Sequence, residues 1–153
     1  MSSAYRSFAH RVDIGAPVER VWRAFTDSRM LARWAAPGAS VTPREKGRLE
    51  ANFGGGMEMD AHIDVLVVPQ RMRLILLPTR GMPSSEAVVV EDFLFERTSP
   101  SETALRLLSS GVPSAQAWVT YYLNKRRHWE LALARLKVFL EKGLDQETPP
   151  PRY

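Results

Sequence analysis

The residues of this sequence that could hold a metal ion gather on one short stretch. Asp60, His62 and Asp64 alternate with apolar residues, so they share one face of a predicted strand. Carboxylate and imidazole groups are common ligands of divalent cations. The same pattern is typical of the water-facing side of a half-buried strand, and neither His10 nor His128 has an evident reason to join it. We therefore expect no metal site and no cofactor.

Lys125 is the most interesting of the other polar residues. On a helical projection it falls inside an apolar stripe, between Tyr122 and Trp129. There, its ammonium group could neutralise an anionic headgroup or polarise a ligand if burial lowered its pKa. The alternative, which we favour, is a lysine whose stem covers apolar surface while its ammonium reaches water. Tyr122 is a similar case, because its hydroxyl needs a partner if it is buried.

Asp92 and His10 complete the set of candidate acids and bases. Asp92 shares one face of a predicted strand with two valines and a leucine, while Phe93 and Phe95 occupy the other. If the first face is buried, Asp92 is a desolvated general-base candidate. If the second is buried, the two phenylalanines line the interior and Asp92 meets water. We favour the second arrangement, because two aromatic side chains are the stronger burial signal.

The common signatures of catalysis are missing. The sequence has 0 cysteines, so it offers no thiolate nucleophile and no disulfide. No serine lies in a Gly-x-Ser-x-Gly context, and the run Gly54–Gly56 lacks the lysine and hydroxyl residue of a phosphate loop. These glycines are better explained as a turn or bulge. We expect no catalytic residue, and a binding protein is favoured over an enzyme.

Hydrophobic periodicity predicts the elements that position these groups. A strand is followed by two short helices, the first entered at Ala16-Pro17 and the second N-capped by Asp27. Strands with short polar connections then indicate an antiparallel meander, in which the odd-numbered residues from Met57 to Val67 share one apolar face. A long amphipathic helix ends at Gly143. The predicted ranges are Arg6–Ile14, a helix from Pro17, a helix through Trp34, Arg48–Phe53, Met57–Val68, Arg71–Leu77, Val88–Arg97, Thr103–Ser110 and Ala115–Lys142.

This order defines an α+β fold with a curved antiparallel sheet of about six to seven strands wrapped around the C-terminal helix. That helix is ~40 Å long and presents an apolar arc of roughly 60°. The arc consists of Trp118, Tyr122, Trp129, Leu133, Leu136 and Leu140. Bulky residues on both surfaces can leave a gap that serves as an apolar ligand site.

Size and charge set the outer limits. The chain has 153 residues and a mild net charge of +4, with its basic residues spread out. We expect one domain over residues 1–143, a flexible Pro-rich tail over 144–153, no nucleic-acid partner, no integral membrane segment and a cytoplasmic location.

Several stretches resemble one known family, the START-like (SRPBCC) superfamily, in the bacterial branch similar to the C-terminal domain of the activator of heat-shock protein 90 ATPase. The opening stretch is fairly specific and the remainder moderately so. The residues that carry the resemblance are Ile14–Asp27, Leu31–Trp34 with Pro37, Val67–Met72, and Trp129 with Leu133, Leu136 and Leu140.

The resemblance implies a helix-grip fold with a hydrophobic cavity between the sheet and the last helix. We expect non-catalytic binding of a small hydrophobic or amphipathic molecule, lipid-like or polyketide-like. The alternatives are a cyclase or hydratase acting in the same cavity, and a chaperone-associated stress-response module; a homodimer is left open. The expected ligand-binding residues are Met59, Leu76, Phe93, Phe95, Trp118, Tyr122, Lys125 and Trp129.

Three departures from the branch lie near that cavity. His128 stands where the branch usually has a glycine before the tryptophan of the terminal helix. The strand Arg73–Leu77 lacks the tryptophan that often follows the middle hairpin, and Leu108–Gly111 lacks a histidine often found before the glycine. The usual ligand chemistry therefore cannot be transferred to this chain.

Overall fold

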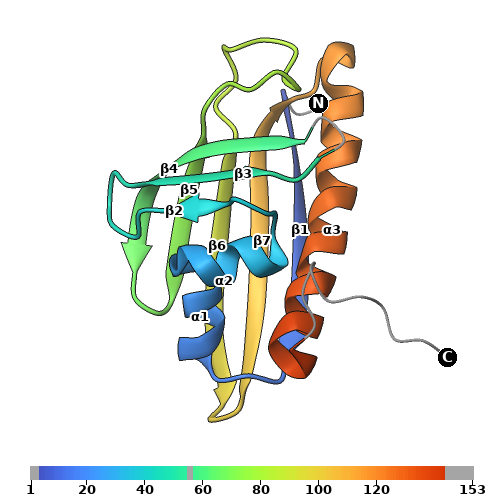
Figure 1. Ribbon diagram of the computed structural model, residues 1–153. Helices are drawn as coiled ribbons and strands as arrows, with labels where there is room; N and C mark the ends of the chain where they lie inside the picture. Colours follow the sequence, from blue (N-terminus) through green and yellow to red (C-terminus); the bar gives the residue numbers. More distant parts are fainter. Residues whose placement is uncertain (1–3, 55–56, 144–153) are drawn as a thin grey trace, which may run out of the picture.

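A computed structural model describes residues 4–54 and 57–143 of the chain (Figure 1). Gly55 and Gly56 of the predicted glycine turn, and the predicted tail over 144–153, lie outside the described residues. The elements in chain order are β1 (Tyr5–Ile14), α1 (Val18–Thr26), α2 (Ser28–Trp34), β2 (Ser40–Val41), β3 (Arg48–Asn52), β4 (Glu58–Val67), β5 (Arg71–Leu76), β6 (Val90–Ser99), β7 (Glu102–Pro113), a 3-10 turn (Gln116–Trp118) and α3 (Val119–Lys142).

The strands form one antiparallel sheet, and its order confirms the predicted meander. The order is β1-β7-β6-β5-β4-β3-β2, so β2 to β7 pair with their neighbours in sequence and β1 closes against β7. Figure 1 shows the sheet curving beside the long helix α3, with α1 and α2 gathered at one end. The α+β helix-grip prediction is therefore confirmed.

Local sequence signals explain how the short helices begin. Pro17 directly precedes α1, and the Asp27 carboxylate caps α2 by accepting hydrogen bonds from the backbone N–H groups of Arg29 and Met30, at 2.9 and 3.3 Å. Such a cap satisfies donors that the first helical turn leaves free. The two helices then bury Phe25, Trp34 and their neighbours against the sheet.

The strand that carries Phe93 and Phe95 buries the face we expected. Both phenylalanines are buried, while Asp92 and Leu94 lie on the opposite side of β6. Phe93 also meets Trp129 of α3 edge-on, with ring centroids 5.2 Å apart. The interior between the sheet and α3 is thus built from aromatic contacts.

Strand β4 corrects one part of the predicted pattern. Its alternation holds from Met59 to Ile63, but the pairing with β5 then shifts register between Ile63 and Val65. Beyond this bulge Leu66 packs against the core and Val67 is 46% exposed, so the prediction that Val67 shares the inner face is wrong. A bulge adds one residue to a strand and moves the following side chains to the other face.

Helix α3 ends as predicted, with Gly143 in the left-handed conformation at φ 71°. Its buried side, however, includes Tyr121, while Tyr122 is only half-buried. Tyr122 leans over the edge strand instead: its ring is 6.0 Å from that of Phe8, and its hydroxyl donates to the Ser7 carbonyl at 3.0 Å. Among the described residues, no helix is long and apolar enough to cross a membrane.

Candidate functional site

An ion pair is buried between the sheet and α3. The Lys125 ammonium and the Glu91 carboxylate lie 2.9 Å apart, and their side chains are 4% and 0% exposed. The alternation of β6 places Glu91 on the same inner face as Phe93, and the helical stripe of α3 turns Lys125 toward that face. The favoured interpretation of Lys125 as a lysine that reaches water is therefore wrong.

Burial and pairing act against each other in this pair. Removal from water raises the pKa of Glu91, and the nearby Lys125 and Trp129 offset only part of that effect. Burial alone lowers the pKa of Lys125, but Glu91 and Tyr121 together raise it above its ordinary value. The lysine is thus held protonated, and Glu91 is a carboxyl group with an increased affinity for a proton.

The pair leaves hydrogen-bonding capacity unused. Glu91 donates and accepts nothing through Oε2, and the hydroxyl of Ser109 likewise lacks a partner among the described residues, although both residues are 0% exposed. Glu91 and Ser109 are cross-strand partners of β6 and β7. Side chains at directly opposed positions lie on the same face and close together. Two unsatisfied polar groups therefore lie next to each other inside an otherwise apolar interior.

Tyr121 connects this pair to the surface. Its ring centroid is 5.5 Å from the Lys125 ammonium nitrogen, and the edge of the ring packs against Trp118 with centroids 5.2 Å apart. Burial raises the pKa of the Tyr121 hydroxyl, so the phenol stays neutral. The same side chain lines an open groove.

We call this feature the helix–hairpin groove, because it lies between α3, the β3–β4 hairpin and the β5–β6 loop. Its volume is about 560 Å³. Its lining combines apolar, aromatic and polar side chains, a composition that suits an amphipathic molecule. The lining residues are Gly54, Met57, Glu58, Thr79, Gly81, Pro83, Ala117, Thr120, Tyr121, Asn124, Arg127, His128 and Leu131.

His128 lies in the wall of the groove and is kept neutral. Burial, with Lys125 and Arg135 nearby, lowers its pKa to about 4. Its ring stacks at a tilt on Phe53, with centroids 4.1 Å apart, and its Nε2 atom is buried without a partner. The residue that departs from the family pattern thus contributes a neutral aromatic surface to this groove.

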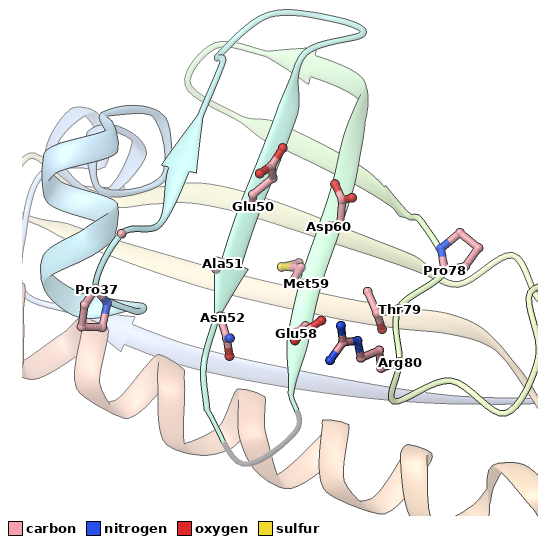
Figure 2. Close-up of a pocket in the computed structure, with 11 residues that line it drawn as sticks. Pro37, Glu50, Ala51, Asn52, Glu58, Met59, Asp60, Pro78, Thr79 and Arg80 are labelled. Carbon is pink, nitrogen blue, oxygen red and sulfur yellow. The ribbon is translucent and has the colours of Figure 1, made fainter.

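A second groove of about 680 Å³ adjoins the first, since Glu58 and Thr79 line both. Figure 2 shows it over β3 and β4, with the guanidinium of Arg80 extended toward Glu58. Two of the carboxylates that line this groove are paired with Arg48: Asp60 accepts a hydrogen bond from it at 2.6 Å, and Glu50 lies 3.4 Å from it. The outer face of β3 and β4 therefore carries solvated ion pairs.

The candidate metal-binding stretch, residues 60–64, takes part in ion pairs on this outer face. Asp60 is paired with Arg48, and Asp64 lies 3.8 Å from Arg73. Among residues 4–54 and 57–143, no group of three or more His, Asp or Glu side chains could hold a metal ion.

The other candidate acids and bases lie apart from Lys125. Asp92 forms an ion pair with Arg71 at 2.8 Å on the outer face of the sheet. His10 Nε2 lies 2.9 Å from the backbone carbonyl of Arg126, and Tyr122 bonds to the edge strand. An enzyme in this interior would need at least one of the four candidate groups inside it, and of the four only Lys125 points into it.

The eight expected ligand-binding residues lie mostly inside the packed core. Tyr122 is half-buried, Met59 also lines the groove of Figure 2, and none of the eight lines the helix–hairpin groove. Nothing observed tests whether they touch a ligand, so that role stays a prediction. The buried members are Met59, Leu76, Phe93, Phe95, Trp118, Lys125 and Trp129.

Sequence reasoning missed Glu91, Ser109 and Tyr121. A signal for Glu91 was present, because it shares its parity on β6 with Phe93 and Phe95, the face we expected to be buried. Ser109 carries the same signal on β7, where it alternates with the buried Leu107. A charged residue between buried aromatics should have prompted a search for a buried partner on α3.

The fold and the site together define a class: a START-like domain with a seven-stranded antiparallel sheet, a long C-terminal helix and a polar group buried between them. Residues 15–141 match the family described as activator of Hsp90 ATPase homolog 1-like protein, and the chain belongs to this family. No curated protein matches the chain.

Solved structures share the fold. The Aha1 dimer from Colwellia psychrerythraea is similar with a TM-score of 0.76 at 22% identity, covering 90% of this chain and 98% of that one. Protein MLL2253 from Mesorhizobium loti has a TM-score of 0.75 at 19% identity, covering 90% of this chain and 98% of that one. PFC0360w, an HSP90 activator from Plasmodium falciparum, has a TM-score of 0.74 at 19% identity, covering 88% of this chain and 95% of that one.

Proposed function

We propose that this protein binds a small, mainly apolar molecule that enters at the helix–hairpin groove, without transforming it. The observation that carries the proposal is the position of Tyr121, which lines the groove and also contacts the buried Lys125–Glu91 pair. An apolar body is accommodated by the groove, and a polar end is directed toward the pair. The earlier expectation of a lipid-like or polyketide-like ligand fits this arrangement.

Two leucines of α3 provide a matched test. Leu131 and Leu123 are both 53% exposed, but only Leu131 lines the groove. We expect the neutral fluorescent apolar probe Nile red to bind the intact protein, and Leu131→Gln to weaken that binding while Leu123→Gln leaves it unchanged. Equal effects of the two substitutions, or no binding at all, would refute the groove as the site.

A catalytic role is the second candidate, and one observation favours it. Glu91 is a buried carboxyl group with a raised pKa, a property that general acids in enzymes share. A cyclase or hydratase would use it together with Lys125. Liquid chromatography with mass spectrometry of the protein incubated with a candidate substrate separates the two functions. A binding protein returns the ligand with unchanged mass and retention time, whereas an enzyme returns a product that differs in mass or, for a cyclisation without loss of water, in retention time.

The names of the relatives raise two further possibilities for this chain. The family description refers to an Hsp90 ATPase activator, and the similar structure from Colwellia is a dimer. A chaperone contact in a stress response would appear as capture by immobilised Hsp90, and a homodimer would appear as twice the chain mass in sedimentation equilibrium.

A further inference from the structure

We propose that Glu91 and Ser109 form a recognition site for a hydroxyl group, so that the bound molecule is a neutral alcohol or phenol and not a carboxylic acid. This inference rests on the proposed binding function and specifies its ligand. It begins with the two unpartnered atoms, Glu91 Oε2 and Ser109 Oγ, on neighbouring strands.

The unused capacity of these atoms defines the missing group. Glu91 Oε2 is a carboxylate oxygen that needs a donor, and the hydroxyl of Ser109 can both donate and accept. A ligand hydroxyl supplies both roles at once, because it donates to the carboxylate while it accepts from the serine. A methyl or methylene group supplies neither, and it would leave both atoms unsatisfied.

Charge excludes an acid at the same place. The Lys125 ammonium is already neutralised by Glu91 Oε1 at 2.9 Å. A carboxylate or phosphate next to Oε2 would place two negative charges side by side in a medium of low dielectric constant, and such a pair is strongly repelled. Lys125 therefore acts on the ligand indirectly: its charge and its hydrogen bond to Oε1 favour the ionised form of Glu91 and leave Oε2 as the acceptor.

The aromatic lining indicates where the apolar part lies. Tyr121 and His128 line the groove; Trp118 packs edge-on against Tyr121, and Phe53 packs at a tilt against His128. The path from groove to pair runs past Tyr121, whose side chain borders both, so we expect it to rotate when the molecule enters. Flat aromatic surfaces of this kind favour a flat aromatic ligand body.

The test uses three probes that share one aromatic body: 2-naphthol, 2-methylnaphthalene and 2-naphthoate. Titration calorimetry at neutral pH should show 2-naphthol binding about tenfold more tightly than the methyl analogue, the effect of one hydrogen bond to a charged group. Ser109→Ala should abolish that preference and leave the affinity for 2-methylnaphthalene unchanged. Ser110→Ala, on the next residue of β7 and the opposite face, is the matched control and should behave as the parent protein.

Ser109→Ala is suited to this purpose because it removes an atom without a partner, so folding does not depend on it. A second variant, Glu91→Met with Lys125→Met, replaces both charges with apolar groups of similar length and should also lose the preference for the hydroxyl. If 2-naphthoate binds most tightly, or if the preference survives in Ser109→Ala, the hydroxyl site is refuted while the binding function stands. A single water molecule that satisfies both atoms permanently would leave the parent protein without a preference for 2-naphthol, which also refutes the hydroxyl site. If none of the probes binds, the proposed function itself fails.

Discussion

Removing one partner of the Lys125–Glu91 pair should cost far more stability than removing both. The two side chains are 4% and 0% exposed, so each charge has lost nearly all its hydration. Replacement of one partner strands the other charge in the interior, and measured losses for such changes are about 3–5 kcal/mol. We therefore expect Lys125→Met to lower the free energy of unfolding by about that amount.

The double variant Glu91→Met with Lys125→Met should behave differently. It removes both desolvation penalties and fills the space with flexible apolar side chains, and comparable replacements are neutral or stabilising by about 1–4 kcal/mol. The coupling energy between the two sites, obtained from a double-mutant cycle, should thus exceed about 3 kcal/mol. A surface ion pair, in contrast, gives at most about 1 kcal/mol.

Urea unfolding followed by tryptophan fluorescence and by circular dichroism measures each variant. The pair Asp92–Arg71 on the outer face, whose side chains are 19% and 38% exposed, is the matched control, and its cycle should give a small coupling energy. If Lys125→Met costs less than about 1 kcal/mol, the ammonium reaches water and the buried pair does not exist.

Three further predictions concern single positions. The pKa of His128 is lowered to about 4 in the folded protein, so as the pH falls this histidine is protonated first in the unfolded chain. The free energy of unfolding should therefore drop by up to about 3 kcal/mol between pH 6.5 and 4. His128→Gln should reduce this pH dependence in urea melts. Gly111 has φ 85°, and a Cβ there would lie 2.0 Å from the Val88 carbonyl oxygen. Gly111→Ala should therefore lower the free energy of unfolding by more than ~2 kcal/mol in thermal melts. Gly143→Ala, at φ 71° in open space, should lower it by only about 1 kcal/mol. Trp129→Ala should cost ~3–5 kcal/mol in the same melts, and a loss below ~1 kcal/mol would place the ring in an open cavity.

Local sequence patterns predicted the fold well because strands β2 to β7 pair with their neighbours in sequence, so alternation and turns largely specify the sheet. Alternation identified the inner face of β6, and the side chain of Asp27 identified the start of α2. Prediction failed after Ile63, where a bulge shifts the register of β4. The bulge is set by pairing with β5 and leaves no mark in the periodicity of β4 itself.

The site was harder to predict because it depends on contacts distant in sequence. Glu91 and Lys125 are 34 residues apart, and neither charge makes physical sense in the interior until the other is placed beside it. Tyr122 shows the opposite error. Its position on the helical stripe indicated burial, but that flank of α3 covers the edge strand β1, where the sheet ends and water begins.

The unpartnered atoms of Glu91 and Ser109 raise the question of why this interior is not simply apolar. Each buried polar group without a hydrogen bond costs about 1–3 kcal/mol. Alanine at position 109 would remove one such cost without breaking a hydrogen bond, because the Ser109 hydroxyl has no partner among the described residues. A pair of methionines in place of Glu91 and Lys125 would remove the larger penalty of the charges. This protein carries both the unpartnered hydroxyl and the buried charges at one place, next to Tyr121, which lines the groove. Such a loss of stability is expected where a protein recognises a polar group.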